Sequence, residues 1–437
     1  MNAHPFIARV RQIDTVRRTG RIRRVLPTFV EADGPAVPIG ALCRIATPHG
    51  APALAHVAAV HDGSIVLVPL DVGLAAAAGA EVEACADAMT VPVGDAFLGR
   101  AVDGLGRPID GQGPVAAGAH APLVEPAGAP LLRADRAEIA ETGVRAIDAL
   151  LTLGQGQRVG LFAASGVGKT TLVNQLARQV GADRCVVCLV GERGREVESL
   201  WSSGLGDEAK GRSVLVAATS DETAAMRVRA CDYALALAAH WRAEGHHVLF
   251  LLDSVTRLAM ALREIGLAAG EPPTVRAYTP SVFAALPKLV ERCGALKAGG
   301  ATTAIMTVLC ETDDADDPVA EAMKSLLDGH ILLSRSLAER GHFPAIDVPR
   351  SISRLAPSLL TSERREAAAR ALEHLSVYES ARLMIEAGVY AAGSNCEIDR
   401  AVAARPALLR FLRQGQDECV PAEAAHRALA ESLEARA

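Results

Sequence analysis

The chain has 437 residues, half of them hydrophobic and 3% aromatic, and a formal net charge of −6. The negative balance disfavours a general binder of nucleic acid, and no apolar run is long enough to span a bilayer. The length predicts about three domains, whose cores must be filled mainly by aliphatic side chains. The first residues lack the apolar core of a secretory signal peptide, so we expect no such leader.

Residues 1–24 are predicted to form a basic N-terminal arm, with seven arginines against one acidic residue. This pattern fits either a solvated arm or a docking segment for an acidic partner or a membrane surface. Residues 25–88 contain short β-like runs between Gly, Pro and Asp turns, which predicts a small β-barrel domain. The clearest runs are Leu42–Ala46, Ala55–Ala59 and Ser64–Pro69.

Residues 89–360 are predicted to form the central domain. They start with a turn-rich connector, Gly99–Gly113, and continue with strands that alternate with helices to about residue 355. That alternation predicts a parallel α/β sheet. Residues 361–437 carry alanine and leucine at helical spacing with almost no strand signal, which predicts a helical C-terminal domain.

The segment Ala163–Thr170 nearly matches the phosphate-binding loop G-x-x-x-x-G-K-[ST], with alanine at its first position. In such a loop, glycines allow backbone N–H groups to turn inward and surround phosphate oxygens. Gly166 and Gly168 supply that freedom here. Lys169 would reach the β- and γ-phosphates, and the Thr170 hydroxyl would hold Mg²⁺.

The context of the loop supports this interpretation. An apolar run, Arg158–Phe162, precedes it, and Thr171–Val180 follows with apolar residues at helical spacing. The loop therefore joins a strand to a helix N-terminus, where free N–H groups and the helix dipole attract an anion. The fold class predicted is an α/β P-loop NTPase of RecA-like type, with an N-terminal β-barrel and a C-terminal helical domain. The loop residues expected to contact nucleotide are Ser165, Gly166, Val167, Gly168, Lys169, Thr170 and Thr171.

Two carboxylates follow apolar strands and could complete a hydrolytic site. Asp253 ends the run Val248–Leu252 and could hold the shell of Mg²⁺, or alternatively cap the next helix. Glu192 follows the run Cys185–Val190 and could polarise the attacking water. The alternative for Glu192 is a surface ion pair with a neighbouring arginine, which would contribute little.

The nine cysteines do not form a recognisable metal or disulfide pattern. Cys185 and Cys188 form a C-x-x-C pair inside an apolar run, and no second pair or His-x-x-x-His follows it. We therefore expect buried free thiols in a reducing cytoplasm rather than a zinc site.

At this point several motifs resemble the type III secretion ATPases, relatives of the catalytic subunits of rotary ATP synthases. The likeness extends from about residue 20 to residue 415. It is carried by the phosphate loop and by Gly191–Val197, Asp253–Arg257, Arg263–Pro272, Pro280–Phe283, Leu286–Arg292, Leu327–His330 and Phe343–Val348.

The resemblance implies a role for each matched position around the phosphates. Lys169 and Thr170 would bind phosphate and Mg²⁺, Glu192 would activate water, and Asp253 would support Mg²⁺. Cofactors would thus be ATP and Mg²⁺. Arg193 and Arg257, each inside a matched motif, would lie near the γ-phosphate.

Three further positions are assigned by the resemblance. Arg354, in Ser351–Arg354, matches an arginine that in relatives reaches the nucleotide of a neighbouring subunit. Phe343 and Tyr390 would enclose the adenine between their rings. The segment Gly388–Cys396 departs from the family pattern around Tyr390, and Ala164 replaces a glycine and should stiffen the phosphate loop.

The resemblance implies an ATPase that energises type III protein secretion as a homohexameric ring at the cytoplasmic face of the inner membrane. Its partners would be stator and stalk proteins, secretion chaperones and exported substrates, without nucleic acid. The acidic segment Glu311–Pro318 favours an injection apparatus over a flagellum.

Other functions remain open from the sequence. A flagellar export ATPase and a catalytic subunit of a rotary F/V-type ATPase share most of these motifs. A nucleotide-holding subunit without turnover would not need Glu192. An RNA-translocating ring ATPase would need stacking aromatic residues in its N-terminal domain, which is poor in them here.

Overall fold

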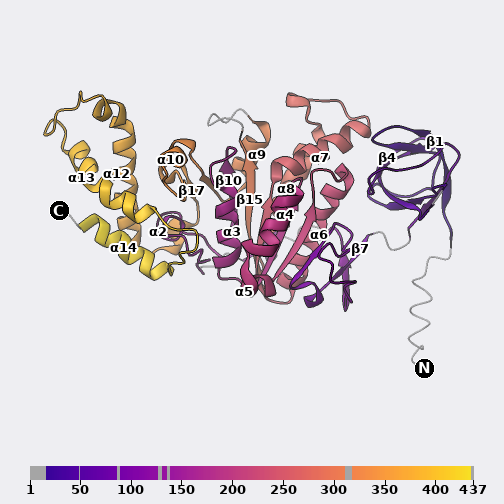
Figure 1. Cartoon of the computed structure of the whole chain (residues 1–437), viewed down its shortest axis with the longest axis horizontal. Helices are drawn as coiled ribbons and strands as arrows, with labels where there is room; N and C mark the ends of the chain where they lie inside the picture. Colours follow the sequence, from indigo (N-terminus) through magenta and orange to yellow (C-terminus); the bar gives the residue numbers. More distant parts are fainter. Residues whose placement is uncertain are drawn as a thin grey trace.

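The structure is a computed structural model that describes residues 16–48, 50–85, 89–125, 130–134, 138–310 and 317–434. Figure 1 shows a β-barrel at one end, a central sheet flanked by helices, and a helical domain at the opposite end. This arrangement confirms the predicted fold class. Most of the predicted basic arm and of the acidic segment, residues 1–15 and 311–316, lies outside the described residues.

Six strands close the N-terminal barrel in the order β1-β2-β5-β4-β3-β6. Its interior is lined by aliphatic side chains such as Val57, Leu67 and Val82. The strands are β1 (Thr19–Val25), β2 (Val30–Ala32), β3 (Leu42–Ile45), β4 (Ala53–His61), β5 (Ser64–Pro69) and β6 (Glu81–Ala84).

The barrel begins earlier than the sequence suggested. Strand β1 starts at Thr19 and pairs with both β2 and β6, so the predicted arm of residues 1–24 overlaps a barrel strand. Ile22 is its one buried residue, and the arginines of β1 face outward. The run of charge on the outer face concealed the strand pattern, because a half-buried strand needs only one apolar face.

The central domain is built on a nine-stranded sheet with the order β17-β16-β10-β15-β13-β11-β12-β8, in which β14 pairs with β15. The strands from β16 to β8 run parallel, and β17 is antiparallel to β16. The strands are β8 (Arg100–Val102), β10 (Arg158–Ala163), β11 (Arg184–Val190), β12 (Ser213–Ala218), β13 (His247–Asp253), β14 (Gly294–Ala295), β15 (Ala301–Leu309), β16 (Gly329–Leu332) and β17 (Ile352–Ser353). A separate pair is formed by β7 (Thr90–Val93) and β9 (Ala119–Pro122).

Helices cover both faces of this sheet, so its inner strands are apolar throughout. Alternate residues of β11 and β13 enter two different hydrophobic clusters: Cys188 and Phe250 face one, Cys185 and Leu249 the other. The two cysteines of the C-x-x-C pair thus lie on opposite faces and cannot share a metal ion. The helices are α2 (Arg145–Leu150), α3 (Lys169–Gln179), α4 (Gly194–Ser199), α5 (Gly206–Gly211), α6 (Ala224–Ala243), α7 (Val255–Ala268), α8 (Pro280–Glu291), α9 (Pro318–Leu326), α10 (Arg335–Glu339) and α11 (Ala356–Leu359).

The predicted connector Gly99–Gly113 contains a strand of the main sheet. Strand β8 pairs in parallel with β12 at the edge of the sheet. Asp110 holds it by accepting hydrogen bonds from Arg100 Nε at 2.7 Å and Arg100 Nη2 at 3.0 Å. Three strand residues among glycines and aspartates were too few for the sequence pattern to reveal.

The C-terminal domain consists of α12 (Ser362–Glu386), α13 (Cys396–Leu412) and α14 (Ala422–Glu434). Gln414, between α13 and α14, connects this domain to the central one. Its Oε1 accepts a hydrogen bond from Arg145 N at 2.8 Å, and its Nε2 donates to Gly143 O at 2.6 Å. Its backbone N–H donates to Phe343 O at 2.9 Å, so the chain segments around Gln414 and Phe343 are held side by side.

His342 lies between the two domains, beside Tyr378 and Arg405, and is 3% exposed. Burial, and after it the positive charges of Arg413 and Arg405, lower the pKa of its imidazole to about 4. The folded protein therefore holds His342 neutral at a pH where the unfolded chain would bind a proton.

We expect this histidine to destabilise the domain contact in acid. Because its folded pKa is depressed, the stabilising contribution is present above about pH 6.5 and is lost as the pH falls towards 4, by about 1–3 kcal/mol. Melting temperatures measured between pH 7.5 and 5 should fall less in a His342→Asn variant than in the natural protein. Equal losses in both proteins would contradict this assignment.

Candidate active site

The phosphate loop spans the turn between the end of β10 at Ala163 and the start of α3 at Lys169. Gly166 and Gly168 have φ angles of 81° and 91°, which side chains rarely adopt. Ala164 has no positive φ and is 6% exposed, so its Cβ packs into the core. The expectation that Ala164 stiffens the loop is therefore wrong, because the left-handed positions are retained as glycine.

The remaining loop residues divide by exposure. Ser165 and Thr170 are exposed at the mouth of the loop, where their hydroxyls are free to meet a ligand. Val167 is 1% exposed, so only its backbone can face an anion. Thr171 is the third residue of α3 and lines the cavity described below.

Three charged groups meet behind this loop. Lys169 Nζ donates a hydrogen bond to Asp253 Oδ1 and lies 3.6 Å from Glu192 Oε1. Each of the three side chains is at most 11% exposed. Strands β11 and β13 are parallel neighbours, so Asp253, the last residue of β13, and Glu192, two residues after β11, emerge at the same edge of the sheet. The structure thus brings together the three residues that the sequence singled out.

The environment of the two carboxylates differs. The Thr307 hydroxyl donates to Asp253 Oδ1 at 2.6 Å, so Asp253 is held by both a cation and a neutral donor. Burial, and after it the negative charge of Asp253, raise the pKa of Glu192 to about 7, against the opposing effect of Lys169. A carboxylate poised near neutral pH is suited to exchange a proton with water.

Two arginines lie near this edge. A Cβ placed on Gly191 would lie 3.0 Å from the Cβ of Arg257, so the glycine lets Arg257 of α7 approach the strand end closely. Arg257 Nε is buried and has no hydrogen-bond partner among the described residues, and a bound anion would satisfy it. Arg193 is exposed at the start of α4.

A cavity of about 350 Å³ opens beside the phosphate loop. Phe343 forms one wall and approaches the loop closely, since a Cβ on Gly168 would lie 3.5 Å from its ring. Gln414, Gly415 and Gln416, between α13 and α14, also line it. An apolar ring beside a phosphate cradle is suited to stack a nucleotide base.

Tyr390 does not line this cavity. Its hydroxyl donates to Asp399 Oδ1 at 2.8 Å and lies 2.9 Å from Asn395 O, within the turn between α12 and α13. Residues 414–416 line the cavity together with Phe343, and Tyr390 does not. The sequence signal missed here was the short break between the helical patterns of α13 and α14.

Arg354 lies far from the phosphate loop of its own chain. It follows β17, which pairs with the first residues of β16 beside the amino end of β10. The six residues of β10 separate that end from the loop, a distance of about 17 Å at 3.3 Å per residue. The Arg354 side chain is exposed and makes no ion pair or hydrogen bond within the described residues.

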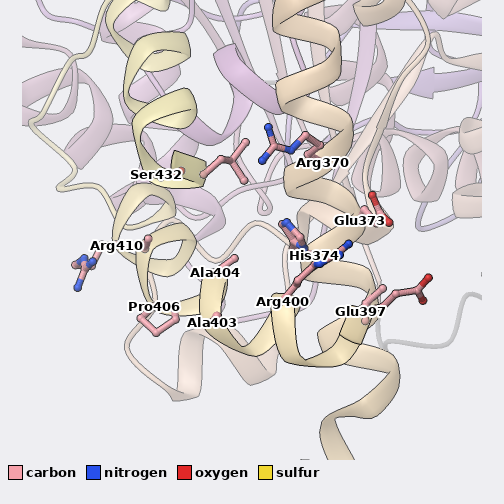
Figure 2. Close-up of a pocket in the computed structure, with 13 residues that line it drawn as sticks. Arg370, Glu373, His374, Glu397, Arg400, Ala403, Ala404, Pro406, Arg410 and Ser432 are labelled. Carbon is pink, nitrogen blue, oxygen red and sulfur yellow. The ribbon is translucent and has the colours of Figure 1, made fainter. Parts of the chain in front are cut away.

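A larger hollow, about 720 Å³, lies in the C-terminal domain between α12, α13 and α14. Figure 2 shows Arg370, Glu373 and His374 along one helix and Glu397 and Arg400 on another. It contains both signs of charge and none of the phosphate-loop residues, so size alone does not identify the nucleotide site.

The residues present fit a magnesium nucleotide. The two left-handed glycines leave the cradle open for phosphate oxygens. The buried Arg257 Nε has no acceptor among the described residues, and an anion would provide one. Thr170 and Asp253 offer the hydroxyl and carboxylate oxygens that Mg²⁺ takes together with phosphate oxygens. Bound Mg²⁺ would neutralise charge that develops on the phosphates.

These features define a P-loop nucleotide-binding protein. Residues 143–353 match the model of the ATP synthase alpha/beta family, nucleotide-binding domain. Residues 360–431 match the T3SS EscN ATPase C-terminal domain. The second match covers most of the helical domain.

The same family is found among individual relatives. The flagellum-specific ATP synthase of Bacillus subtilis is 43% identical over 426 residues, 96% of each chain. The type 3 secretion system ATPase of Sinorhizobium fredii is 44% identical over 410 residues, 93% of this chain and 90% of that one. The assembled ATPase EscN of enteropathogenic E. coli has a TM-score of 0.89 at 39% identity and covers 95% of this chain and 100% of that one.

The chain therefore belongs to the ATP synthase alpha/beta family and is an ATPase of its flagellar and type 3 secretion branch, as the resemblance predicted. Both kinds of relative match at nearly equal identity, so the comparisons do not separate them. Within the described ranges, no helix combines the length and apolar character needed to cross a bilayer.

The position of Glu192 leads to a prediction for turnover. A Glu192→Gln variant keeps the shape and the contact with Lys169 but cannot take up a proton, so kcat should fall by about 10²–10⁴-fold. The affinity for nucleotide should stay close to that of the natural protein, as measured with a fluorescent ATP analogue. Undiminished phosphate release by this variant would remove Glu192 from water activation.

The cavity leads to a second prediction. Phe343→Ala should raise KM for ATP by about 10-fold through loss of base stacking, and Phe343→Tyr should restore it. Tyr390→Ala should leave KM unchanged, because Tyr390 lies outside the cavity. A rise in KM for Tyr390→Ala as large as that for Phe343→Ala would reinstate Tyr390 as a base contact.

Proposed function

We propose that this chain hydrolyses ATP with Mg²⁺ at a site shared between neighbouring copies in a homohexameric ring. The carrying observation is the location of Arg354, an exposed arginine at the amino end of the sheet, while Lys169 lies at its carboxyl end. Arg354 cannot reach the nucleotide of its own subunit, but a head-to-tail ring would bring it to the next one.

Within one subunit, the roles follow from the contacts. The loop from Ser165 to Gly168 surrounds the phosphates, and Lys169 neutralises them. Thr170 and Asp253 hold Mg²⁺, and Arg257 and Arg193 contact the γ-phosphate side. Glu192 orients the attacking water, and Phe343 stacks on the base.

We propose further that hydrolysis energises type 3 protein export at the cytoplasmic face of the inner membrane. Matches to flagellar and type 3 secretion ATPases over nearly the whole chain support this, and so does the match to the EscN C-terminal domain. EscN has also been solved in complex with its central stalk EscO, which supports a stalk partner for this chain. Stator proteins, secretion chaperones and exported substrates complete the proposed partners.

Two other export or energy systems use similar chains. A flagellar export ATPase is the alternative to the injection apparatus, and the high identity to flagellar relatives favours it as strongly. A catalytic subunit of a rotary F/V-type ATPase shares the nucleotide-binding family model. The match of residues 360–431 to a type 3 secretion domain favours export over rotary synthesis.

The shared site is tested by Arg354→Ala. Turnover should fall by about 10³–10⁵-fold, as for other arginines supplied in trans, while nucleotide binding is retained. The matched control is Arg350→Ala, another exposed arginine four residues earlier, which should keep its activity. Normal phosphate release by Arg354→Ala rings would exclude Arg354 from the site.

A second test uses the natural protein. Because isolated subunits lack the cation from a neighbour, the activity per subunit should rise with protein concentration and reach a plateau once rings have formed. Phosphate release and mass photometry on the same dilution series would show both quantities together. Constant specific activity down to concentrations where only monomers are present would contradict the shared site.

A further inference from the structure

We propose that Asp328, with Gln157 and Ser353, is a positioning residue that holds Arg354 in place for the active site of the neighbouring subunit. The inference deepens the proposed function and rests on it, because Arg354 must act in trans. It concerns residues at the amino end of the sheet, remote from the nucleotide site of their own chain.

Asp328 binds Arg354 through its backbone and Arg158 through its side chain. The Arg354 N–H donates to Asp328 O at 3.0 Å. Asp328 Oδ2 accepts from Arg158 N at 3.0 Å and Arg158 Nε at 2.8 Å, and Oδ1 accepts from Arg158 Nη2 at 3.0 Å. The Asp328 N–H in turn donates to Arg158 O at 2.8 Å. Asp328, whose carbonyl accepts the Arg354 N–H, is thus bonded through its carboxylate and its own N–H to Arg158, the first residue of β10.

A second connection reaches the residue before Arg354. Gln157 is 1% exposed, and its Nε2 donates to Ser353 Oγ at 3.0 Å and lies 3.3 Å from Asp328 O. Ser353 Oγ donates to Thr152 O at 2.8 Å. Side-chain hydrogen bonds therefore fix Ser353, and a backbone hydrogen bond fixes Arg354, where β17 ends.

The backbone here is also tightly packed. A Cβ on Gly329, the partner of Ser353, would lie 2.4 Å from Ile352 O, so only glycine permits this approach of β17 to β16. Yet β17 has only two residues, too few to be held by strand pairing alone. The polar contacts of Asp328 and Gln157 supply the missing constraint.

Such a constraint matters because Arg354 has no other support. Its side chain is exposed and makes no ion pair or hydrogen bond within the described part of the chain. The direction in which it points therefore depends on its backbone. A displacement of about 1 Å in a catalytic group can cost about 10²-fold in rate.

A purely structural role for the Asp328–Arg158 pair would also reduce activity, so the test must separate the two. The phosphate loop of an Asp328→Asn subunit is intact, and only the arginine that it offers to its neighbour should be misplaced. A Lys169→Ala subunit has the opposite defect, since it cannot bind phosphate properly but offers a well-placed Arg354. Mixing the two recreates intact sites wherever a phosphate loop of the first meets an arginine of the second.

The experiment compares rings assembled from equimolar mixtures of monomers. Asp328→Asn alone should lose at least 10-fold in kcat while the KM and the affinity for an ATP analogue change less than 2-fold. With Lys169→Ala, about one quarter of the sites in random head-to-tail rings should be intact, and activity should return towards that fraction. A mixture of Arg354→Ala and Lys169→Ala subunits shows how much activity returns when the arginine itself is the missing group, and it is the reference for the first mixture. Asp110→Asn, which breaks a comparable aspartate–arginine pair at the opposite sheet edge, should keep its activity.

Each outcome decides the inference. Recovery in both mixtures supports it. Recovery with Arg354→Ala but not with Asp328→Asn overturns it and leaves the shared site standing, because Asp328 would then act within its own subunit. Recovery in neither mixture overturns the shared site and this inference with it. If Asp328→Asn does not fold, Ser353→Ala removes one contact of the same turn and should show a smaller loss with the same recovery.

Discussion

The ammonium group of Lys169, held between the carboxylates of Asp253 and Glu192, is the contact on which the rest of the site depends. It exists because β10, β13 and β11 are parallel strands of one sheet, so the residues that follow them meet at one edge. Three features surround this cation. The loop glycines adopt left-handed conformations, the Thr307 hydroxyl donates to Asp253, and Gly191 lets Arg257 approach the strand end.

The same contact bears on the proposal that one subunit alone is an incomplete catalyst. Two buried carboxylates offset most of the positive charge that Lys169 and Arg257 bring to the site. Phosphoryl transfer spreads negative charge over the transferred group, and stabilising it requires a further cation placed in advance. The exposed side chain of Arg354, at the other end of the sheet, is available to supply that charge to a neighbour.

The sequence predicted those parts of the site that depend on one strand end and the loop after it. Lys169, Glu192 and Asp253 were found because apolar runs marked their strands. The wall formed by residues 414–416 could not be found in this way, because it reaches Phe343 only through the docking of the helical domain by Gln414. Tyr390, which the resemblance assigned to the base, is not among the residues that line this cavity. In the fold, β1 and β8 were missed because charged and turn residues masked short strands at the edges of their sheets.

Strand β10 connects the two ends of each subunit. Its last residue leads into the phosphate loop, and its first residue, Arg158, binds the aspartate that carries Arg354. Parallel pairing with β15 and β16 and burial on both faces make this strand stiff along its length. On the proposed shared site, a shift of the loop on nucleotide binding must therefore either be absorbed by the glycines or move Arg354 relative to the neighbouring subunit. The left-handed conformations of Gly166 and Gly168, which glycine adopts without strain, favour absorption within the loop, so that the proposed contact of Arg354 with the neighbouring site is preserved.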